Sequence, residues 1–491
     1  MRDPSRGPRQ VLGPDRIRLL VVLGVPLLAW VLVRWSVVGG ADPQPAFSMN
    51  ELAFLPDSTR ILTAIKVWGH GLYLCMLPFN LVCIYSAVVF EKVNTLLDPG
   101  FLASALALLL FLFLGLRYAR RAPLLFLAMA WFLGFSFLTS NIPLAIGTVF
   151  GERLYYTPSL GICLLPALFL PLLRPQLQQM LMLMLLLWTA LCCAVILQRN
   201  FVWKNDATLF KNDVKVQPKS IDLHRKAADV YMSGEKRDLD EARRLLMKAV
   251  QLDTNYPLAY LDLGDIALQE GEWKEAITEY KYVLKSRYLG PSGAEPFAHA
   301  GIGKAWLGLE KPDQAMQAFQ RSLGAESRNH IAWTGIGRVH AMRNEIPEAA
   351  KAFLKAIGFA PRHRQAWLEL TRYGGETLPP GQVFELSRRA LVDLFPGDPE
   401  MFIYVGGMGY KAGLRPSYVA SVLRWGIDNL PPDQRSAPNT FTARFYLAHT
   451  LEQVDRAAAI GLYSEIVNHP SCPKQEQVEA QKRLRALQSR R

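Results

Sequence analysis

The sequence predicts an all-α protein in two parts, a polytopic transmembrane helical domain over residues 1–201 and an α-solenoid of repeated helix pairs over residues 202–491. Two observations lead to this fold class. Apolar stretches follow one another up to about Gln198, and a mixture rich in Glu, Lys, Arg and Ala follows from Arg199 onward. In the second part, small and aromatic residues recur at a fixed period. We therefore expect the two parts to fold in different solvents.

Six stretches in the first part come close to the roughly 20 apolar residues that a helix needs to cross about 30 Å of hydrocarbon. They lie at about 18–38, 68–90, 101–117, 122–140, 155–173 and 177–198. The first follows several arginines, but its apolar core is long and no cleavage site stands out. We interpret it as a retained helix, so the sequence predicts a multi-pass integral membrane protein whose first partner is membrane lipid.

Basic residues between the spans indicate the orientation, because Lys and Arg favour the cytosolic side. The turn 117–121 is the densest basic loop, and placing it in the cytosol puts residues 140–153 and the repeat part on the extracytoplasmic, periplasmic or luminal side. The N-terminal arginines also favour the cytosol, and six full spans cannot satisfy both ends. We therefore expect one segment to be re-entrant, and 68–90 is the candidate because Gly71, Pro78 and Asn80 interrupt it.

The net charge of +13 does not predict a nucleic-acid partner. The basic residues form no aromatic-interleaved patch, and several of them flank apolar spans. The six cysteines include no CxxC pair, so the sequence indicates no disulfide framework. His469 and Cys472 have the spacing of metal ligands, but no second pair accompanies them, and we expect no metal site there.

A period of about 34 residues identifies the second part as tetratricopeptide repeats (TPRs), in which two helices cross closely at small residues. The repeats are clear over about 222–361 and degenerate from there to the end, with an insertion at 288–293. Each residue at a characteristic position is expected to pack the helix pairs: Gly264, Ala276, Gly303, Ala315, Trp333, Gly337, Ala349, Phe353, Ala356 and Pro361. A stacked array of such pairs predicts a concave groove that binds a protein or peptide.

The stretch from Asn141 to Gly161 is the candidate site for chemistry. Glu152 and Arg153 lie at the mouth of an apolar span, where an ion pair is costly without a partner or water. Arginine suits bidentate binding of a phosphate, and the tyrosines that follow, including Tyr156, suit stacking on a sugar. The alternative interpretation is a helix-end ion pair with interfacial aromatic anchors.

Three ordered runs carry a resemblance to a known family. Residues 151–163 read GERLYYTPSLGIC, residues 50–86 contain NELAF, RILTA, LYL, LP and YS, and residues 203–210 read WKNDATLF. Together with the repeats, they resemble the transmembrane and TPR-containing O-mannosyltransferases, which are membrane glycosyltransferases of the GT-C type. The match covers most of the chain, although Glu51 replaces the proline that usually follows the asparagine.

The resemblance implies a polyprenyl-phosphate-linked sugar as donor and protein Ser or Thr as acceptor. It implies that Arg153 holds the lipid phosphate and that Glu152 and Tyr156 shape the sugar pocket. A carboxylate would act as base, with a divalent metal as a possible helper. In the family an acid pair in the first outer loop is catalytic, and the chain is expected to correspond to a C-terminal portion. Residues 39–63 offer only Asp42, Glu51 and Asp57, so no catalytic residue is assigned.

Two functions therefore stay open at the level of sequence. The first is a glycosyltransferase, or a portion of one, whose TPRs bind the acceptor or a partner. The second is a non-catalytic, membrane-anchored TPR scaffold for protein–protein interaction, which the missing acid pair favours.

Overall fold

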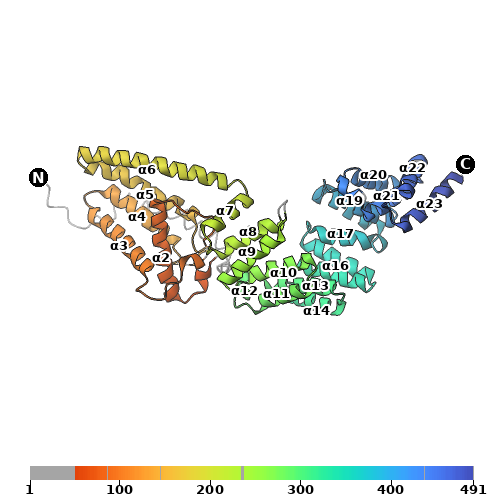
Figure 1. The fold of residues 1–491 in the computed structure, drawn as a ribbon, viewed down its shortest axis with the longest axis horizontal. Helices are drawn as coiled ribbons and strands as arrows, with labels where there is room; N and C mark the ends of the chain where they lie inside the picture. Colours follow the sequence, from red (N-terminus) through yellow and green to blue (C-terminus); the bar gives the residue numbers. More distant parts are fainter. Residues whose placement is uncertain (1–49, 86, 144, 234–236, 436, 490–491) are drawn as a thin grey trace, which may run out of the picture. The chain divides into compact units, whose positions relative to one another are not determined.

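The computed structural model describes residues 50–85, 87–143, 145–233, 237–435 and 437–489. The regular secondary structure of these residues is helical, and the one β-type contact among them is an isolated bridge between Tyr85 and Phe150 (Figure 1). The predicted all-α class is confirmed. The first predicted span, 18–38, lies outside the described residues.

Packing divides the chain into two compact units. One unit ends at Pro78, resumes at Tyr85 and ends at Leu183, and the other comprises Phe79–Ile84 and the chain from Met184 onward. The division falls inside the last long apolar helix. The domain boundary that we placed after residue 201 stays a prediction.

The first unit is a bundle of helices that pack in chain order. Its described helices are α2 (Asp57–Met76), α3 (Pro99–Tyr118), α4 (Pro123–Leu138) and α5 (Tyr156–Phe169), and α6 (Pro175–Val202) begins in it. Short 3-10 turns lie between them at Glu51–Phe54, Ala87–Phe90, Glu152–Tyr155 and Leu170–Leu172. A Cβ on Gly69 would lie 2.3 Å from Ser104, and one on Gly161 would lie 2.3 Å from the Ala128 carbonyl. Small residues thus let α2 approach α3 and α5 approach α4, as in membrane helix bundles.

Two described helices, α3 and α6, are long and apolar enough to cross a membrane. Most apolar side chains of α6 are exposed, and no residue in its 28-residue length is buried. The other predicted spans are shorter or broken. Helix α4 has 16 residues, and α5 has 14 residues with Pro166 inside it. The structure therefore supports fewer full-length spans than the six apolar stretches suggested.

The stretch 68–90 is not one helix. Helix α2 ends at Met76, and Asn80 has a φ of 56°, a left-handed conformation that cannot continue an α-helix. Helix α2 also begins at Asp57, eleven residues before this stretch, and carries Arg60 and Lys66. The hydropathy pattern therefore predicted the wrong residue at each end of this helix.

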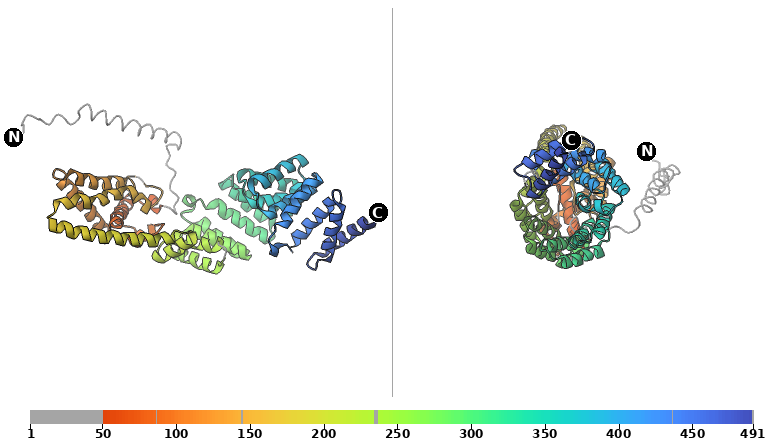
Figure 2. Two further views of the ribbon diagram at one scale, coloured as in Figure 1. Left: turned by 90° about the horizontal axis from the view of Figure 1, so that it is seen from above. Right: turned by 90° about the vertical axis from the view of Figure 1, so that its right-hand side faces the viewer.

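The second unit stacks helix pairs one after another (Figures 1 and 2). After α7 (Asp206–Val216), the first and second helices of successive pairs are α8 (Ile221–Ser233) and α9 (Leu239–Leu252), α10 (Pro257–Glu270) and α11 (Trp273–Lys285), α13 (Glu295–Gly308) and α14 (Pro312–Ala325), and α15 (His330–Met342) and α16 (Ile346–Phe359). The insertion forms the short helix α12 (Leu289–Ser292).

The degenerate end of the array is also built from helix pairs. Its helices are α17 (Arg364–Tyr373), α18 (Pro380–Arg388), α19 (Pro399–Lys411), α20 (Pro416–Asp428), α21 (Pro438–Leu451), α22 (Arg456–Asn468) and α23 (Lys474–Ser489). Helix α19 pairs with α20, and α21 pairs with α22.

Aromatic rings fill the space that glycines leave between helices. A Cβ on Gly264, Gly303 or Gly337 would lie 2.4 to 2.6 Å from the ring of Tyr280, Phe319 or Phe353, respectively. The alanines at the characteristic positions, Ala276, Ala315, Ala349 and Ala356, are fully buried. Trp333 is half-buried and donates to the Ser327 carbonyl at 3.1 Å. Pro361 is half-buried, and its carbonyl accepts from Trp367 at 2.8 Å.

Candidate functional site

A hydrogen-bonded loop positions the candidate site between α4 and α5. Asn141 is fully buried, and its φ of 61° lies in the left-handed region that asparagine tolerates. Its side-chain oxygen accepts from the Asn50 amide at 2.8 Å and from the Ile146 N–H at 2.9 Å. Its amide nitrogen donates to the carbonyls of Thr148 and Val149 at 3.1 and 3.0 Å. One side chain thus fixes the path of the loop.

Arg60 of α2 fixes the start of the same loop. Its guanidinium donates to the Asn141 and Ile142 carbonyls at 2.8 and 3.2 Å and to the Asp57 carboxylate at 3.0 Å. The buried Asn50 also donates to the Ile146 carbonyl at 2.6 Å. The loop is therefore held by residues far away in sequence.

The side chains of the three predicted binding residues do not all face the same way. Glu152 is half-buried, and its carboxylate accepts from the Tyr85 hydroxyl at 2.7 Å. Arg153 is exposed, and the side chain of Tyr156 is 86 % exposed. Arg153 and Tyr156 thus lie at the surface where the Glu152–Tyr155 turn leads into α5, while Glu152 faces the protein.

An aromatic cluster lies beneath this turn. The Tyr155 ring is buried, and a Cβ on Gly71 would lie 2.0 Å from it, so α2 leaves room for this ring. The Phe150 ring lies 5.2 Å from the Tyr155 ring in a tilted arrangement and 4.8 Å from the Tyr85 ring in an edge-to-face arrangement, between ring centroids. The cluster supports the backbone on which Glu152 and Arg153 stand.

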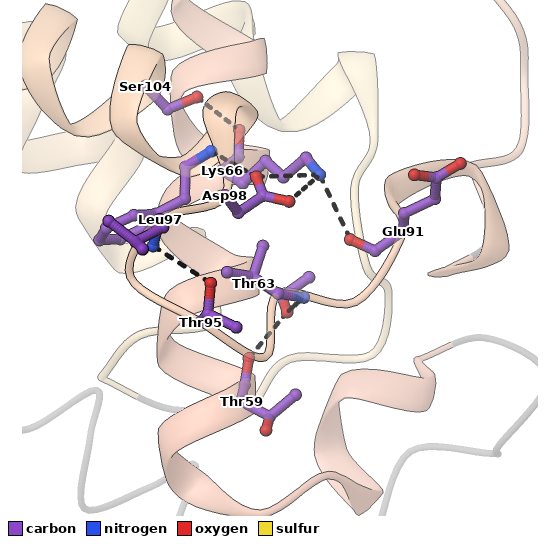
Figure 3. Close-up of polar contacts among 10 residues, drawn as sticks. Thr59, Thr63, Lys66, Glu91, Thr95, Leu97, Asp98 and Ser104 are labelled. Atoms are coloured by element: carbon purple, nitrogen blue, oxygen red, sulfur yellow. Dashed lines mark hydrogen bonds and ion pairs between the residues drawn. The ribbon is translucent and has the colours of Figure 1, made fainter.

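A second polar group joins α2 to the start of α3 (Figure 3). The Lys66 amine lies 3.4 Å from the Asp98 carboxylate and donates to the Glu91 carbonyl at 3.4 Å. Asp98 caps α3 by accepting from the Phe101 N–H at 2.8 Å, and this hydrogen bond, with Lys66, holds the pKa of Asp98 below its usual value. The arrangement suits the capping of an apolar helix at an interface.

The carboxylates that the sequence offered as a base are placed only in part. Asp42 lies outside the described residues, and Asp57 is paired with Arg60. The described residues contain no group of three or more His, Cys, Asp or Glu side chains that could hold a metal ion. They therefore provide no ligand set for the divalent metal that the resemblance implied.

In the second unit, carboxylates gather on the first helices of two neighbouring pairs. The Tyr256 hydroxyl bonds to Asp222 at 2.7 Å, Arg225 to Asp262 at 2.6 Å, and the Tyr280 hydroxyl to Asp265 at 2.6 Å. Burial raises the pKa of Asp222 and of Asp262 to about 6, although hydrogen bonds or cations oppose the rise. Both carboxylates are therefore ionised at pH 7 at an electrostatic cost.

Sequence reasoning missed most of these partners. The sequence pattern gave no role to Asn50, Arg60 or Asn141, because their hydrogen bonds join residues more than 80 positions apart. The charged residues on the first helices did carry a signal, since several of them directly follow the small residue at which two helices cross.

Comparisons with known proteins agree with this architecture. Models of the tetratricopeptide-repeat family match residues 235–286 and 301–367. The protein O-mannosyl-transferase TMTC3 of Mus musculus is 25 % identical over 63 % of this chain and 39 % of its own length. A Caenorhabditis elegans protein O-mannosyl-transferase is 26 % identical over 42 % of this chain and 30 % of its own length.

The chain is therefore similar to the TMTC protein O-mannosyl-transferases and contains tetratricopeptide repeats. It spans well under half the length of the curated relatives that it matches. Among solved structures, Pseudomonas aeruginosa PilF is similar, with 17 % identity, a TM-score of 0.37, and coverage of 46 % of this chain and 97 % of that chain. Yeast Tom70 is similar with 16 % identity, a TM-score of 0.37, and coverage of 57 % of this chain and 58 % of that chain.

Proposed function

We propose that the chain is a multi-pass, membrane-embedded glycosyltransferase-like protein. It transfers, or helps to transfer, a sugar from a polyprenyl phosphate to protein Ser or Thr, and its TPRs bind the acceptor or a partner on the extracytoplasmic side. The O-mannosyl-transferase relatives and the two long apolar helices support this proposal.

One observation carries the donor side of the proposal. Arg153 is exposed at the end of a hydrogen-bonded loop and directly before α5. A phosphate at this turn would meet a guanidinium that can bind two of its oxygens.

The neighbouring residues have complementary roles in this proposal. Tyr156 offers an exposed aromatic face for a sugar ring, and Glu152 borders the pocket while Tyr85 orients its carboxylate. No catalytic base is assigned, and no step of the proposal uses a metal.

The substitution Arg153→Ala tests this function in the purified chain in detergent. We expect it to weaken binding of a polyprenyl phosphate at least tenfold and to abolish transfer of mannose from polyprenyl-phosphate mannose to a Ser/Thr-rich peptide. Arg153→Lys should recover part of the binding, because it keeps the charge and loses the bidentate geometry. Arg174→Ala, which removes another exposed arginine beside an apolar helix, is the matched control. Unchanged lipid binding by Arg153→Ala would refute the phosphate role.

The second candidate function is a non-catalytic scaffold, which the helix pairs of the second unit favour because TPRs bind proteins. Binding of polyprenyl phosphate through Arg153 separates the two candidates, because a scaffold has no need of a donor lipid. Lipid binding without transfer would indicate that the chain acts with a second catalytic component.

A further inference from the structure

The first helices of the TPR pairs carry a column of charged residues. Each member directly follows the residue at the helix crossing, and the last three recur at the 34-residue repeat period. The column consists of Asp229, Asp265, Lys304, Arg338 and Arg372, on α8, α10, α13, α15 and α17 respectively. We call these five residues the charge ladder. Its sign changes once, from acidic to basic, between α10 and α13.

Contacts between neighbouring first helices place the ladder on one face. Each of these helices packs beside the next along the array. Arg225 of α8 bonds to Asp262 of α10 at 2.6 Å, and Arg338 of α15 lies 3.7 Å from Glu369 of α17. Between these two contacts, Lys304 of α13 interacts electrostatically with Asp265 and with Arg338. The ladder is therefore continuous in space.

Solvent reaches the ladder at both ends. Asp229 and Lys304 are exposed, and the side chains of Arg338 and Arg372 are 48 % and 58 % exposed. Beyond Arg372 the face continues into a cavity of about 220 Å³ that Tyr404, Lys411 and Tyr446 help to line. A ligand lying along the first helices can thus reach Asp229, Lys304, Arg338 and Arg372. Asp265 is half-buried and accepts from the Tyr280 hydroxyl.

The charges at each end are only partly neutralised. Around α8 and α10, four carboxylates outnumber the three neighbouring cations, which are Arg225, Lys226 and Lys304. The carboxylates are Asp222, Asp229, Asp262 and Asp265. Burial raises the pKa of Asp262 to about 6, Arg225 opposes the rise, and Asp265 and Asp229 add to it. In the basic part, Lys304 and Arg338 repel each other, and Asp265 attracts Lys304.

We propose that this face binds an extended peptide with its charges in two blocks, basic residues against α8 and α10 and acidic residues against α13, α15 and α17. The inference rests on the proposed role of the TPRs in holding a protein and names the charge pattern of that protein. Five helices about 10 Å apart span roughly 40 Å, which an extended peptide of about 12 residues covers. A nucleic acid, negative throughout, would meet repulsion at the acidic end.

The test compares two fluorescein-labelled 12-residue peptides of identical composition, using fluorescence anisotropy with the full chain in detergent micelles. One peptide has its Lys and Glu residues in two blocks, and the other has them alternating. We expect the block peptide to bind at least tenfold more tightly at low salt, with the advantage shrinking at 0.5 M salt because exposed charges are screened.

A charge reversal tests the residues themselves. Arg338→Glu combined with Arg372→Glu should weaken the block peptide at least tenfold and strengthen an all-Lys peptide. The control, Lys274→Glu with Lys351→Glu, makes the same change in net charge on the exposed side of second helices and should leave block-peptide binding unchanged.

The outcomes separate this inference from the proposed function. Equal affinity for the block and alternating peptides, or equal loss in the control variant, overturns the charge pattern and leaves TPR-mediated protein binding standing. Tighter binding of a single-stranded oligonucleotide than of the block peptide overturns the choice of a peptide. If neither peptide binds while Arg153 still binds polyprenyl phosphate, both this inference and the TPR role fail, and the donor site stands.

Discussion

The missing side chain at Gly303 sets how closely α13 and α14 approach each other. We expect Gly303→Ala to destabilise the TPR part by about 1–3 kcal/mol, because its Cβ would lie 2.5 Å from the Phe319 ring, which must shift. The matched control is Gly324→Ala in α14, where a Cβ meets nothing within 4 Å. That variant should gain about 0.5–1 kcal/mol, because alanine is the better helix former. Thermal unfolding by circular dichroism measures both, and a stabilised Gly303→Ala variant would contradict the packing.

His363 makes stability depend on pH. Burial, followed by the nearby His330 and Lys304 charges, lowers its pKa from 6.5 to about 4. Because the folded state favours neutral His363, its contribution to stability is complete above pH 6.5 and is lost as the pH falls toward 4. We expect His363→Asn to flatten this part of the pH profile of the melting temperature, relative to the unmodified chain. Parallel profiles between pH 7 and pH 4 would show that His363 ionises freely in the folded state.

Single residues were predictable where their role repeats. The 34-residue period placed Gly264, Gly303 and Gly337 at helix crossings, where the structure has them against aromatic rings. The loop before Arg153 offered no such repetition. The conformation of Asn141 depends on Asn50 and Arg60, which reach it only through the fold.

At the scale of elements, a buried ion pair ties the end of α6 to α7. Arg199 makes a two-point bond to Asp213 at 2.5 and 2.8 Å, and Asp213 is fully buried. The second Asp213 oxygen also accepts from the Cys83 N–H at 2.7 Å. This carboxylate therefore fixes three separate stretches of one unit.

Removal of that carboxylate should be costly. We expect Asp213→Ala to destabilise the chain by about 3–5 kcal/mol, because it removes the carboxylate that is paired with the largely buried Arg199 charge. The double variant Arg199→Met with Asp213→Leu should recover much of this loss, since it removes both charges together. Melting temperatures in detergent measure the effect. A double variant less stable than Asp213→Ala would show that the geometry of the pair matters more than its charge.

Element type was predictable throughout, and element length was not. Hydropathy marks where apolar residues begin, but the residues that end a helix, such as Asn80 after α2, are only partly visible in sequence. Helices α4 and α5 lie within predicted spans and are shorter than those spans, because α4 ends before Thr139 and α5 passes into the 3-10 turn Leu170–Leu172.

At the scale of the whole chain, the side of the membrane on which the TPRs lie is testable. The substitution Ile346→Thr completes an Asn-x-Thr acceptor at Asn344, an exposed turn residue between α15 and α16. In sealed microsomes we expect this variant to be N-glycosylated and its TPR part to resist added protease. Asn344→Gln in the same background is the control. An unmodified, protease-sensitive TPR part would place the repeats in the cytosol.

The aromatic rings between the helix pairs each join two repeats. Tyr280 fits against Gly264 of its own pair and Gly301 of the next, and Phe319 fits against Gly303 and Gly335 in the same way. If two such arrays recombine within a loop of this stretch, one aromatic ring is therefore separated from one of the two glycines that it packs against. An exchange between the pair α13–α14 and the pair α15–α16 would restore both glycines, because these two pairs share the same glycine positions. An exchange with the pair that begins with α17 would not restore both glycines, because Glu369 of α17 occupies the place of the second one.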